Sequence, residues 1–267
     1  MRVLMGAAVA AMLFSSVSIA RAQEAQAEPA QPEGFGLSFS TGIDYSSGRY
    51  GQAEKTDILV VPMSARATAG RLSLTATLPY LRIDGPGGVV VGPGGDPLPG
   101  VPTAGGVRQG LGDLSLGATY TIPAEALSGF ELGIGGRVKL PTSDEALQLS
   151  TGETDLAASA DISYPIGNVI PFVNIGYRVL GDAAGTDLRD GPTASVGSSF
   201  VIGQSVLIAS YDYAQSVNPA VADSHELFAG ISGPITSRLN VTGYGVAGLS
   251  DGSPDFGIGV LISARLF

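Results

Sequence analysis

The sequence predicts an all-β fold, a single antiparallel up-and-down transmembrane β-barrel of about twelve strands. Three observations lead to this prediction. Apolar residues recur at every second position in twelve separate runs, most runs span about 9 to 11 residues, and the connections alternate between short and long. Runs of this length suit a tilted bilayer crossing, which needs about 9 to 11 residues, better than soluble strands of about 5 to 6 residues.

The composition agrees with a barrel whose outer surface is apolar. Of 267 residues, 44% are hydrophobic and 14% are charged, whereas soluble proteins have about 25% charged residues. The 39 glycines follow no Gly-X-Y period, which excludes collagen. The lack of cysteine and the single histidine, His225, exclude disulfide scaffolds, thiolate zinc sites, cysteine nucleophiles and multi-histidine metal sites. The net charge of -10 argues against nucleic acid as a partner.

The first 22 residues have the features of a cleaved signal peptide. Arg2 precedes an apolar run, and Ala20-Arg21-Ala22 has the small-x-small pattern of a cleavage site. A membrane-anchoring helix is the weaker alternative, because the run is short and rich in small residues. Residues 23–35 contain few apolar residues and are predicted to be a disordered periplasmic lead-in. Residues 36–267 are then the one barrel domain.

Each predicted strand has one apolar face and one face of small or polar residues. In the first strand, Leu37, Phe39 and Ile43 lie on one side, whereas Ser38 and Asp44 lie on the other. Leu239 to Leu249 is Gly-rich and less regular than the other runs. In order, the predicted strands are residues 37–46, 59–67, 72–80, 114–120, 130–140, 156–164, 169–179, 194–202, 207–213, 227–231, 239–249 and 256–266.

The connections between these strands differ in length from one end of the predicted barrel to the other. The short ones are residues 70–71, 123–129, 165–168, 203–204 and 233–237, and the long or acidic ones are 47–54, 84–110, 142–153, 181–191, 215–224 and 250–255. Short periplasmic turns and longer outer loops are typical of outer-membrane barrels. An even number of strands then places both termini in the periplasm.

Aromatic residues gather near the predicted strand ends, as the interfacial girdles of a membrane barrel require. One girdle would contain Phe39, Tyr120, Phe130, Tyr164, Phe200 and Phe267, and the other Tyr45, Tyr80, Tyr177, Tyr211, Tyr213 and Phe256. Tyr244 lies in mid-strand and does not fit. A soluble β-sandwich would also alternate, but it has no reason to sort its aromatic residues in this way. The C-terminal Phe267 is typical of barrels recognised by the assembly machinery, although the alternation ends one residue earlier, at Leu266.

Several short motifs resemble those of a known family. Leu78-Pro79-Tyr80, a Gly-rich loop and Gly110-Leu111-Gly112-Asp113 resemble the LPY and GLGD elements of the outer-membrane transporter family named for the MetA-pathway of phenol degradation. Residues 139–144 are similar to its K-x-P-T-G-D motif, with Ser143 where glycine is usual, and residues 150–155 and 174–177 match later motifs. The resemblance covers about residues 72 to 180. It implies a monomeric or weakly oligomeric channel for small solutes, with aromatic compounds as candidates.

Charged residues fall on the polar faces, which would line the lumen. The lumen-lining candidates are Asp113, Glu131, Arg137, Lys139, Asp155, Asp161, Arg178, Asp212 and Glu226, with Asp44 and Arg66 on the same faces. We expect Arg137 and Lys139 to form ion pairs with neighbouring-strand carboxylates, those of Asp113 and Asp161. Two interpretations stay open: the charges fill and cross-link a narrow barrel, or they form a mixed-charge constriction that selects solutes. Residues 84–110 either fold inward or form an external loop.

The predicted function is an outer-membrane channel for passive uptake of small solutes through a charged lumen. Aromatic compounds are candidate solutes, and no cofactor or metal site is expected. Expected partners are the lipid bilayer, lipopolysaccharide, the solute and, through Phe267, the barrel-assembly machinery. One alternative is a filled structural or adhesive barrel without transport. A second is a hydrolase, which would depend on His225; neighbouring Ser224 and Glu226 point to the opposite strand face, so we expect a surface residue without a catalytic role.

Overall fold

The computed structural model describes residues 35–93, 95–183 and 185–266. The predicted signal peptide, nearly all of the lead-in and the terminal Phe267 lie outside these residues. Two 3-10 turns, η1 (Ala124–Ala126) and η2 (Glu145–Leu147), are the only helical elements of the described chain. Neither these turns nor any other described segment forms a helix that is long and apolar enough to cross a membrane.

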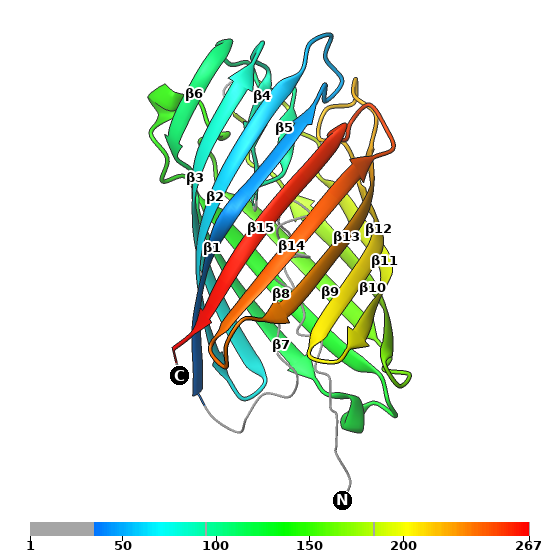
Figure 1. Ribbon diagram of the computed structural model, residues 1–267. Coiled ribbons are helices and arrows are strands. Elements are labelled where there is room, and N and C mark those ends of the chain that lie inside the picture. Colours follow the sequence, from blue (N-terminus) through cyan, green and yellow to red (C-terminus); the bar gives the residue numbers. More distant parts are fainter. Residues whose placement is uncertain (1–34, 94, 184, 267) are drawn as a thin grey trace, which may run out of the picture.

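The described chain forms a closed antiparallel barrel, which confirms the predicted fold class (Figure 1). The wall consists of β1 (Phe35–Gly48), β2 (Thr56–Ala69), β3 (Leu72–Gly85), β6 (Gly106–Leu111), β7 (Leu114–Ile122), β8 (Glu131–Leu140), β9 (Asp155–Ser163), β10 (Val169–Val179), β11 (Gly191–Ile202), β12 (Ser205–Ala214), β13 (Ser224–Pro234), β14 (Leu239–Gly248) and β15 (Phe256–Arg265). β6 and β7 both pair with β3 and together make one interrupted strand, so the wall has twelve strands. Pairing of β1 with β15 closes it.

The two ends of the barrel differ. β1 begins and β15 finishes at the end that carries the tight turns, which we call the turn end. The opposite end carries the longer connections, and we call it the loop end. The strands are strongly tilted against the barrel axis (Figure 1), as closure of a sheet into a barrel requires.

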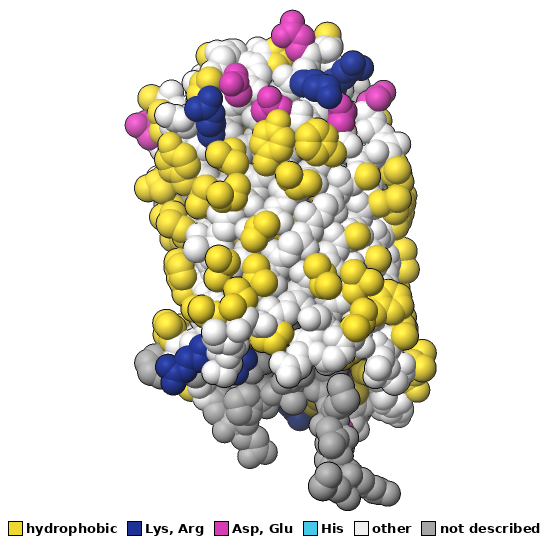
Figure 2. All heavy atoms as spheres, viewed as in Figure 1, with side chains coloured by type: hydrophobic (Ala, Val, Ile, Leu, Met, Phe, Trp, Pro, Cys, Tyr) yellow, Lys and Arg dark blue, Asp and Glu magenta, His cyan; other side chains and the backbone are white. Residues whose placement is uncertain are grey.

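The alternation predicted from the sequence separates the outside of the wall from the inside. On β15, Ile258 and Val260 point outward and are more than half exposed, whereas Leu261 points inward and is fully buried. Outward-facing apolar side chains form a belt between the charged loop end and the basic residues of the turn end (Figure 2). An apolar belt of this kind suits contact with lipid chains and would be unusual on a protein in water.

Aromatic side chains flank the belt at both ends, as predicted. At the turn end, Phe130 packs on Tyr164 with ring centroids 4.7 Å apart, and at the loop end Tyr45 lies 6.0 Å from Phe256. Tyr244, the residue that did not fit either girdle, points into the lumen and is 7% exposed. On β14 it alternates with more exposed residues and shares the inner face with Thr242 and Val246. It therefore does not belong to either aromatic girdle.

The long connection after β3 folds into the barrel. It forms a small hairpin of β4 (Val89–Val91) and β5 (Pro97–Pro99), paired only with each other. Val89 and Val91 are buried in one cluster with Ile58 and Leu81 from the inner face of the wall. This location decides between the two interpretations of residues 84–110 in favour of the inward one.

The opposite side of the hairpin is covered by the other loops. Val90 and Leu98 are fully buried and pack in a second cluster with Leu180, Leu188 and Val217. Because both sides of the hairpin are apolar and covered, it is held at the loop end by burial of apolar surface. The same contact explains why β2 is apolar on both faces near this end: its outer face belongs to the apolar belt and its inner face contacts the hairpin.

Candidate functional site in the lumen

All nine predicted lumen residues lie at inward positions of their strands or, in the case of Asp113, at the break between β6 and β7. Six of them are buried: Asp113, Glu131, Lys139, Asp155, Arg178 and Asp212. Arg137, Asp161 and Glu226 are partly buried. Their charges form separate groups with different surroundings.

The first group is an ion-pair cluster centred on Lys139. The Nζ atom of Lys139 lies 3.0 Å from Oδ2 of Asp113 and 3.0 Å from Oδ2 of Asp155, and it donates a hydrogen bond of 2.9 Å to Thr151 Oγ1. The ammonium is therefore surrounded by three oxygen atoms, and its side chain is only 1% exposed. The expected pair with Asp113 is present. The second carboxylate is that of Asp155, directly opposite Lys139 on β9, and the expected partner Asp161 instead accepts a hydrogen bond from Asn174.

The two carboxylates also bind loop backbone. Oδ1 of Asp113 accepts hydrogen bonds of 2.9 Å from the N–H groups of Thr142 and Ser143, and Oδ1 of Asp155 accepts one of 2.9 Å from Gly181. These contacts join three of the motifs that carried the family resemblance, GLGD, K-L-P-T-S-D and S-T-G-E-T-D. The motifs thus form one buried cluster that fixes loops at the loop end, which favours a structural role for Lys139 and its partners.

The second group is basic and includes the hairpin. Arg137 on β8 and Arg178 on β10 are both register partners of Ala157 on the intervening strand β9, so the two arginines lie at the same level of the barrel. Asp96 of the hairpin interacts with both arginines. Its Oδ2 atom lies 3.5 Å from Nη1 of Arg178, and its carboxylate also interacts electrostatically with Arg137. Burial raises the pKa of the Asp96 carboxyl to about 6, against the opposite effect of the two guanidinium groups.

The third group is acidic and belongs to other strands. Asp212 on β12 and Glu226 on β13 are register partners, and Asp44 lies on β1. Each has a hydroxyl partner: Ser210 donates to Asp212 over 2.8 Å, Ser224 to Glu226 over 2.8 Å, and Tyr244 to Asp44 over 2.7 Å. The strand order places β8 to β10 and β12 to β1 in different sectors of the wall. We call the part of the lumen around Arg137 and Arg178 the basic sector, although β8 and β9 also carry Glu131, Asp155 and Asp161, and we call the part around Asp44, Asp212 and Glu226 the acidic sector.

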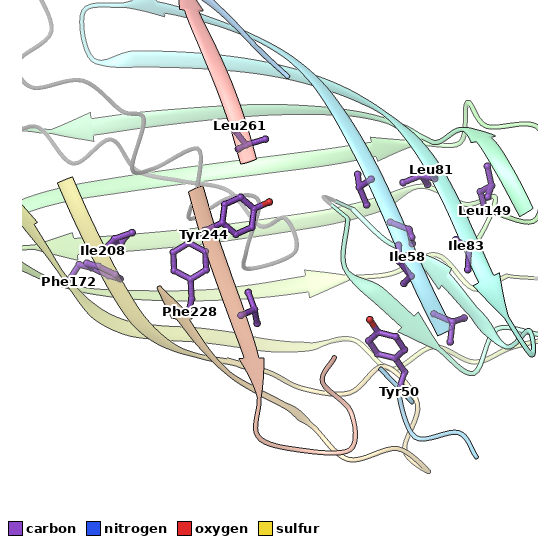
Figure 3. Close-up of a cluster of buried hydrophobic side chains, with 14 residues drawn as sticks. Tyr50, Ile58, Leu81, Ile83, Leu149, Phe172, Ile208, Phe228, Tyr244 and Leu261 are labelled. Carbon is purple, nitrogen blue, oxygen red and sulfur yellow. The ribbon is translucent and has the colours of Figure 1, made fainter. Parts of the chain in front are cut away.

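Beyond the charges, the lumen carries a set of apolar side chains that the sequence analysis did not single out. Phe172, Ile208, Phe228, Tyr244 and Leu261 are buried on inward positions of five strands (Figure 3). The rings of Phe228 and Tyr244 are 5.7 Å apart. A Cβ atom at Gly259 would overlap the Tyr244 ring, so glycine there leaves the ring its place. The sequence did contain a sign of these apolar lumen residues, because Phe172 and Phe228 are large apolar residues on the otherwise more polar faces of their strands.

His225 is the second residue of β13, next to the loop that precedes this strand. Its Nδ1 atom is 2.6 Å from the hydroxyl oxygen of Tyr211, and its ring also packs 5.3 Å from that of Tyr213. The backbone N–H of His225, and not its ring, bonds to Ser250 and Ser253. The hydrogen-bond partner of the imidazole Nδ1 atom is therefore a tyrosine, whereas the hydrolytic pair considered from the sequence would place a serine there.

Comparisons with known proteins add structural relatives. The sequence matches no protein-family model and no curated protein. Its fold is similar to the crystal structure of the COG4313 outer-membrane channel from Pseudomonas putida F1, with a TM-score of 0.68, 14% identity and coverage of 89% of this chain and 97% of that one. Weaker similarity extends to the P. putida toluene transporter TodX, with a TM-score of 0.44, 13% identity and coverage of 88% and 90%. At these identities the comparison with the COG4313 channel establishes a shared barrel fold.

Proposed function

We propose that the chain is an outer-membrane channel for passive uptake of small solutes, with aromatic compounds as candidates. The observation that carries this proposal is a closed twelve-strand barrel with an apolar exterior and a lumen divided into a basic sector, an acidic sector and an apolar patch. Charged groups inside a barrel are typical of selective pores. The fold shared with the COG4313 channel supports the proposal.

The same proposal includes the orientation and the partners. Both described ends of the chain lie at the turn end, so the termini are placed in the periplasm and the long loops outside. The apolar belt contacts the lipid bilayer, and the acidic loop end faces lipopolysaccharide, with Phe267 as the signal for the assembly machinery. The phenol-degradation family is part of this proposal, supported by the buried cluster that its motifs form around Lys139.

One observation favours the runner-up, a filled structural barrel. The hairpin occupies the loop end of the lumen, and Val89, Val90 and Leu98 are fully buried there. A barrel with a permanently fixed hairpin would pass little or no solute. The two functions therefore differ in whether the hairpin leaves a conducting path.

Single-channel conductance in a planar bilayer tests the proposal. The protein would be the refolded chain 23–267, alone and with residues 86–105 replaced by a short Gly-Ser linker. We expect a steady current from the intact chain and a larger current after the replacement. Silence that the replacement relieves would make the hairpin a closed gate. Silence in both proteins, with folding shown by heat-modifiable gel mobility, would contradict the channel and favour the structural barrel.

A further inference from the structure

Three cations of the described barrel are buried, Lys139, Arg108 and Arg178, and they are not equally satisfied. Arg108 donates from both Nη atoms to the backbone oxygens of Gln148 and Val89. Lys139 has three oxygen partners at 2.9 to 3.0 Å. Arg178, which is 5% exposed, donates one hydrogen bond of 2.6 Å from Nη2 to the backbone oxygen of Gln215. Its Nε atom is buried without a hydrogen-bond partner. Because an unsatisfied buried donor on a charged group is costly, Arg178 has unused binding capacity of a kind that Lys139 does not have.

Asp96 is a poor partner for this guanidinium. Its closest approach to Arg178 is 3.5 Å through a single oxygen atom, whereas charge-assisted N–H···O bonds measure about 2.7–2.9 Å and arginine favours two parallel bonds to one carboxylate. The hairpin sets the position of Asp96. Hairpin residues on either side of it are held by apolar packing, and the backbone N–H of Gly92 donates a hydrogen bond to the backbone carbonyl oxygen of Asp96. A carboxylate that is not tied to the hairpin could approach Arg178 with both oxygen atoms.

The other charges near Asp96 also bear on its exchange. Arg137 attracts the Asp96 carboxylate from β8. Glu226, on the acidic sector, interacts electrostatically with Asp96 and repels it. Arg178 itself is further influenced by Asp155 and Tyr213. A carboxylate at the position of Asp96 is therefore attracted by Arg137 and Arg178 and repelled by Glu226. The two arginines thus form an anion site that favours one orientation of the carboxylate.

We propose that Arg178 is the binding site for the carboxylate group of a solute, and that Asp96 occupies this site when no solute is bound. The solute class is an organic monocarboxylate. Binding replaces the loose contact of Asp96 with two hydrogen bonds to the guanidinium, and it releases the 3.5 Å ion pair between the hairpin and the lumen wall. This inference rests on the proposed channel function and names a solute class for it.

Titration of the refolded full-length mature chain with three matched probes tests the site. Benzoate, benzyl alcohol and benzylammonium share one ring and differ in charge. Binding is measured by calorimetry in detergent micelles, and the current block by each probe is measured in a planar bilayer. We expect benzoate to bind best. We expect Asp96→Asn to tighten benzoate binding about tenfold, because the competing carboxylate is gone, and Arg178→Gln to abolish it.

Two further variants keep the test decisive. Arg178→Lys retains the charge but not the planar fork, so it should bind benzoate more weakly than the wild type. Arg189→Gln removes an exposed arginine at the same end, paired with Asp223 at 3.4 Å, and should leave binding unchanged. Equal benzoate binding in the wild type, Asp96→Asn and Arg178→Gln would overturn the inference, as would stronger binding of benzylammonium. Potassium chloride current with no benzoate effect would contradict this site alone, whereas absence of current both in the intact chain and after replacement of residues 86–105 would contradict the channel.

Discussion

At the scale of single residues, the buried ammonium of Lys139 holds two carboxylates that would otherwise repel each other. Removal of one partner from a buried ion pair leaves an uncompensated charge in a medium of low polarity. Here the loss would leave two such charges, those of Asp113 and Asp155, and it would loosen the loops that their other oxygen atoms bind. The motifs of the family resemblance thus have a physical explanation in one cluster.

We expect Lys139→Met to lower the free energy of unfolding by about 3–5 kcal/mol. The matched control is Lys55→Met, because Lys55 forms a 2.7 Å pair with Asp255 but is 52% exposed, and exposed pairs contribute about 0–1 kcal/mol. Urea unfolding in lipid vesicles, followed by heat-modifiable gel mobility, measures both. Equal stability of the two variants would contradict a structural role for the cluster.

Gly259 and Gly243 give a second residue-scale prediction. A methyl group at Gly259 would overlap the Tyr244 ring, whereas at Gly243 it meets no atom within 4 Å. Gly259→Ala must displace Tyr244 and weaken its 2.7 Å hydrogen bond to Asp44. We expect a loss of about 1–3 kcal/mol, and little change for Gly243→Ala, in the same unfolding measurement. A tolerated Gly259→Ala would mean that the ring has room to move.

At the scale of elements, the strands show which features of a chain local sequence can determine. Alternation with period two fixes the face of each side chain, because a shift by one residue would expose every apolar side chain of the strand to the lumen. Sequence therefore predicted the wall and its outward residues, such as Ile258 and Val260 on β15. It did not predict the interruption between β6 and β7 at Gly112 and Asp113. At this interruption Asp113 forms its ion pair with Lys139, a contact between two strands that local sequence does not indicate.

Depth along β15 gives an element-scale prediction. Val260 lies in the middle of the strand and points outward, whereas Phe256 lies at its loop end. We expect Val260→Arg to destabilise the barrel by about 2–4 kcal/mol in lipid vesicles and Phe256→Arg by distinctly less, because the cost of a charge falls toward the interface. Folding yield and unfolding midpoint in vesicles measure the difference. Equal costs would argue against a membrane boundary near Phe256.

The hairpin of β4 and β5 gives another. Leu98 is fully buried between the hairpin and the neighbouring loops, while Leu249, at the same end, is 56% exposed. A charge at Leu98 cannot stay buried, so we expect Leu98→Asp to expel the hairpin and raise the conductance toward that of the hairpin-replaced protein. Leu249→Asp should leave the conductance near the wild-type value. An unchanged current in Leu98→Asp would mean that the hairpin does not limit the path.

At the scale of the whole molecule, the lumen combines charges that are far apart in the sequence. Arg137 and Arg178 meet across Ala157, and Asp212 meets Glu226 only through the pairing of β12 with β13. The arginines on one side and the carboxylates on the other create an electric field across the lumen, which would act on any charged solute inside it. The predicted lumen residues lie at inward positions of the wall, and their partners follow from strand register.

His225 gives a whole-molecule prediction that separates transport from hydrolysis. Its ring contacts Tyr211 and Tyr213 at the loop end, outside the charged groups of the lumen. We expect His225→Ala to leave conductance unchanged, with a small loss of stability from the Tyr211 contact. Planar-bilayer recording of correctly folded protein measures this. A lost current in the folded variant would show that His225 takes part in function.

The sequence by itself determined the barrel, its strand faces, its aromatic girdles and the inward position of its charges, because each depends on a local period of two residues. Only the tertiary structure decided the place of residues 84–110, the partners of Lys139 and the inward position of Tyr244 among apolar lumen residues. The physical reason is that Val89, Val90 and Leu98 have no strand period that assigns them a face. They are buried because surfaces from β2, β3 and two distant loops meet around them in the closed barrel.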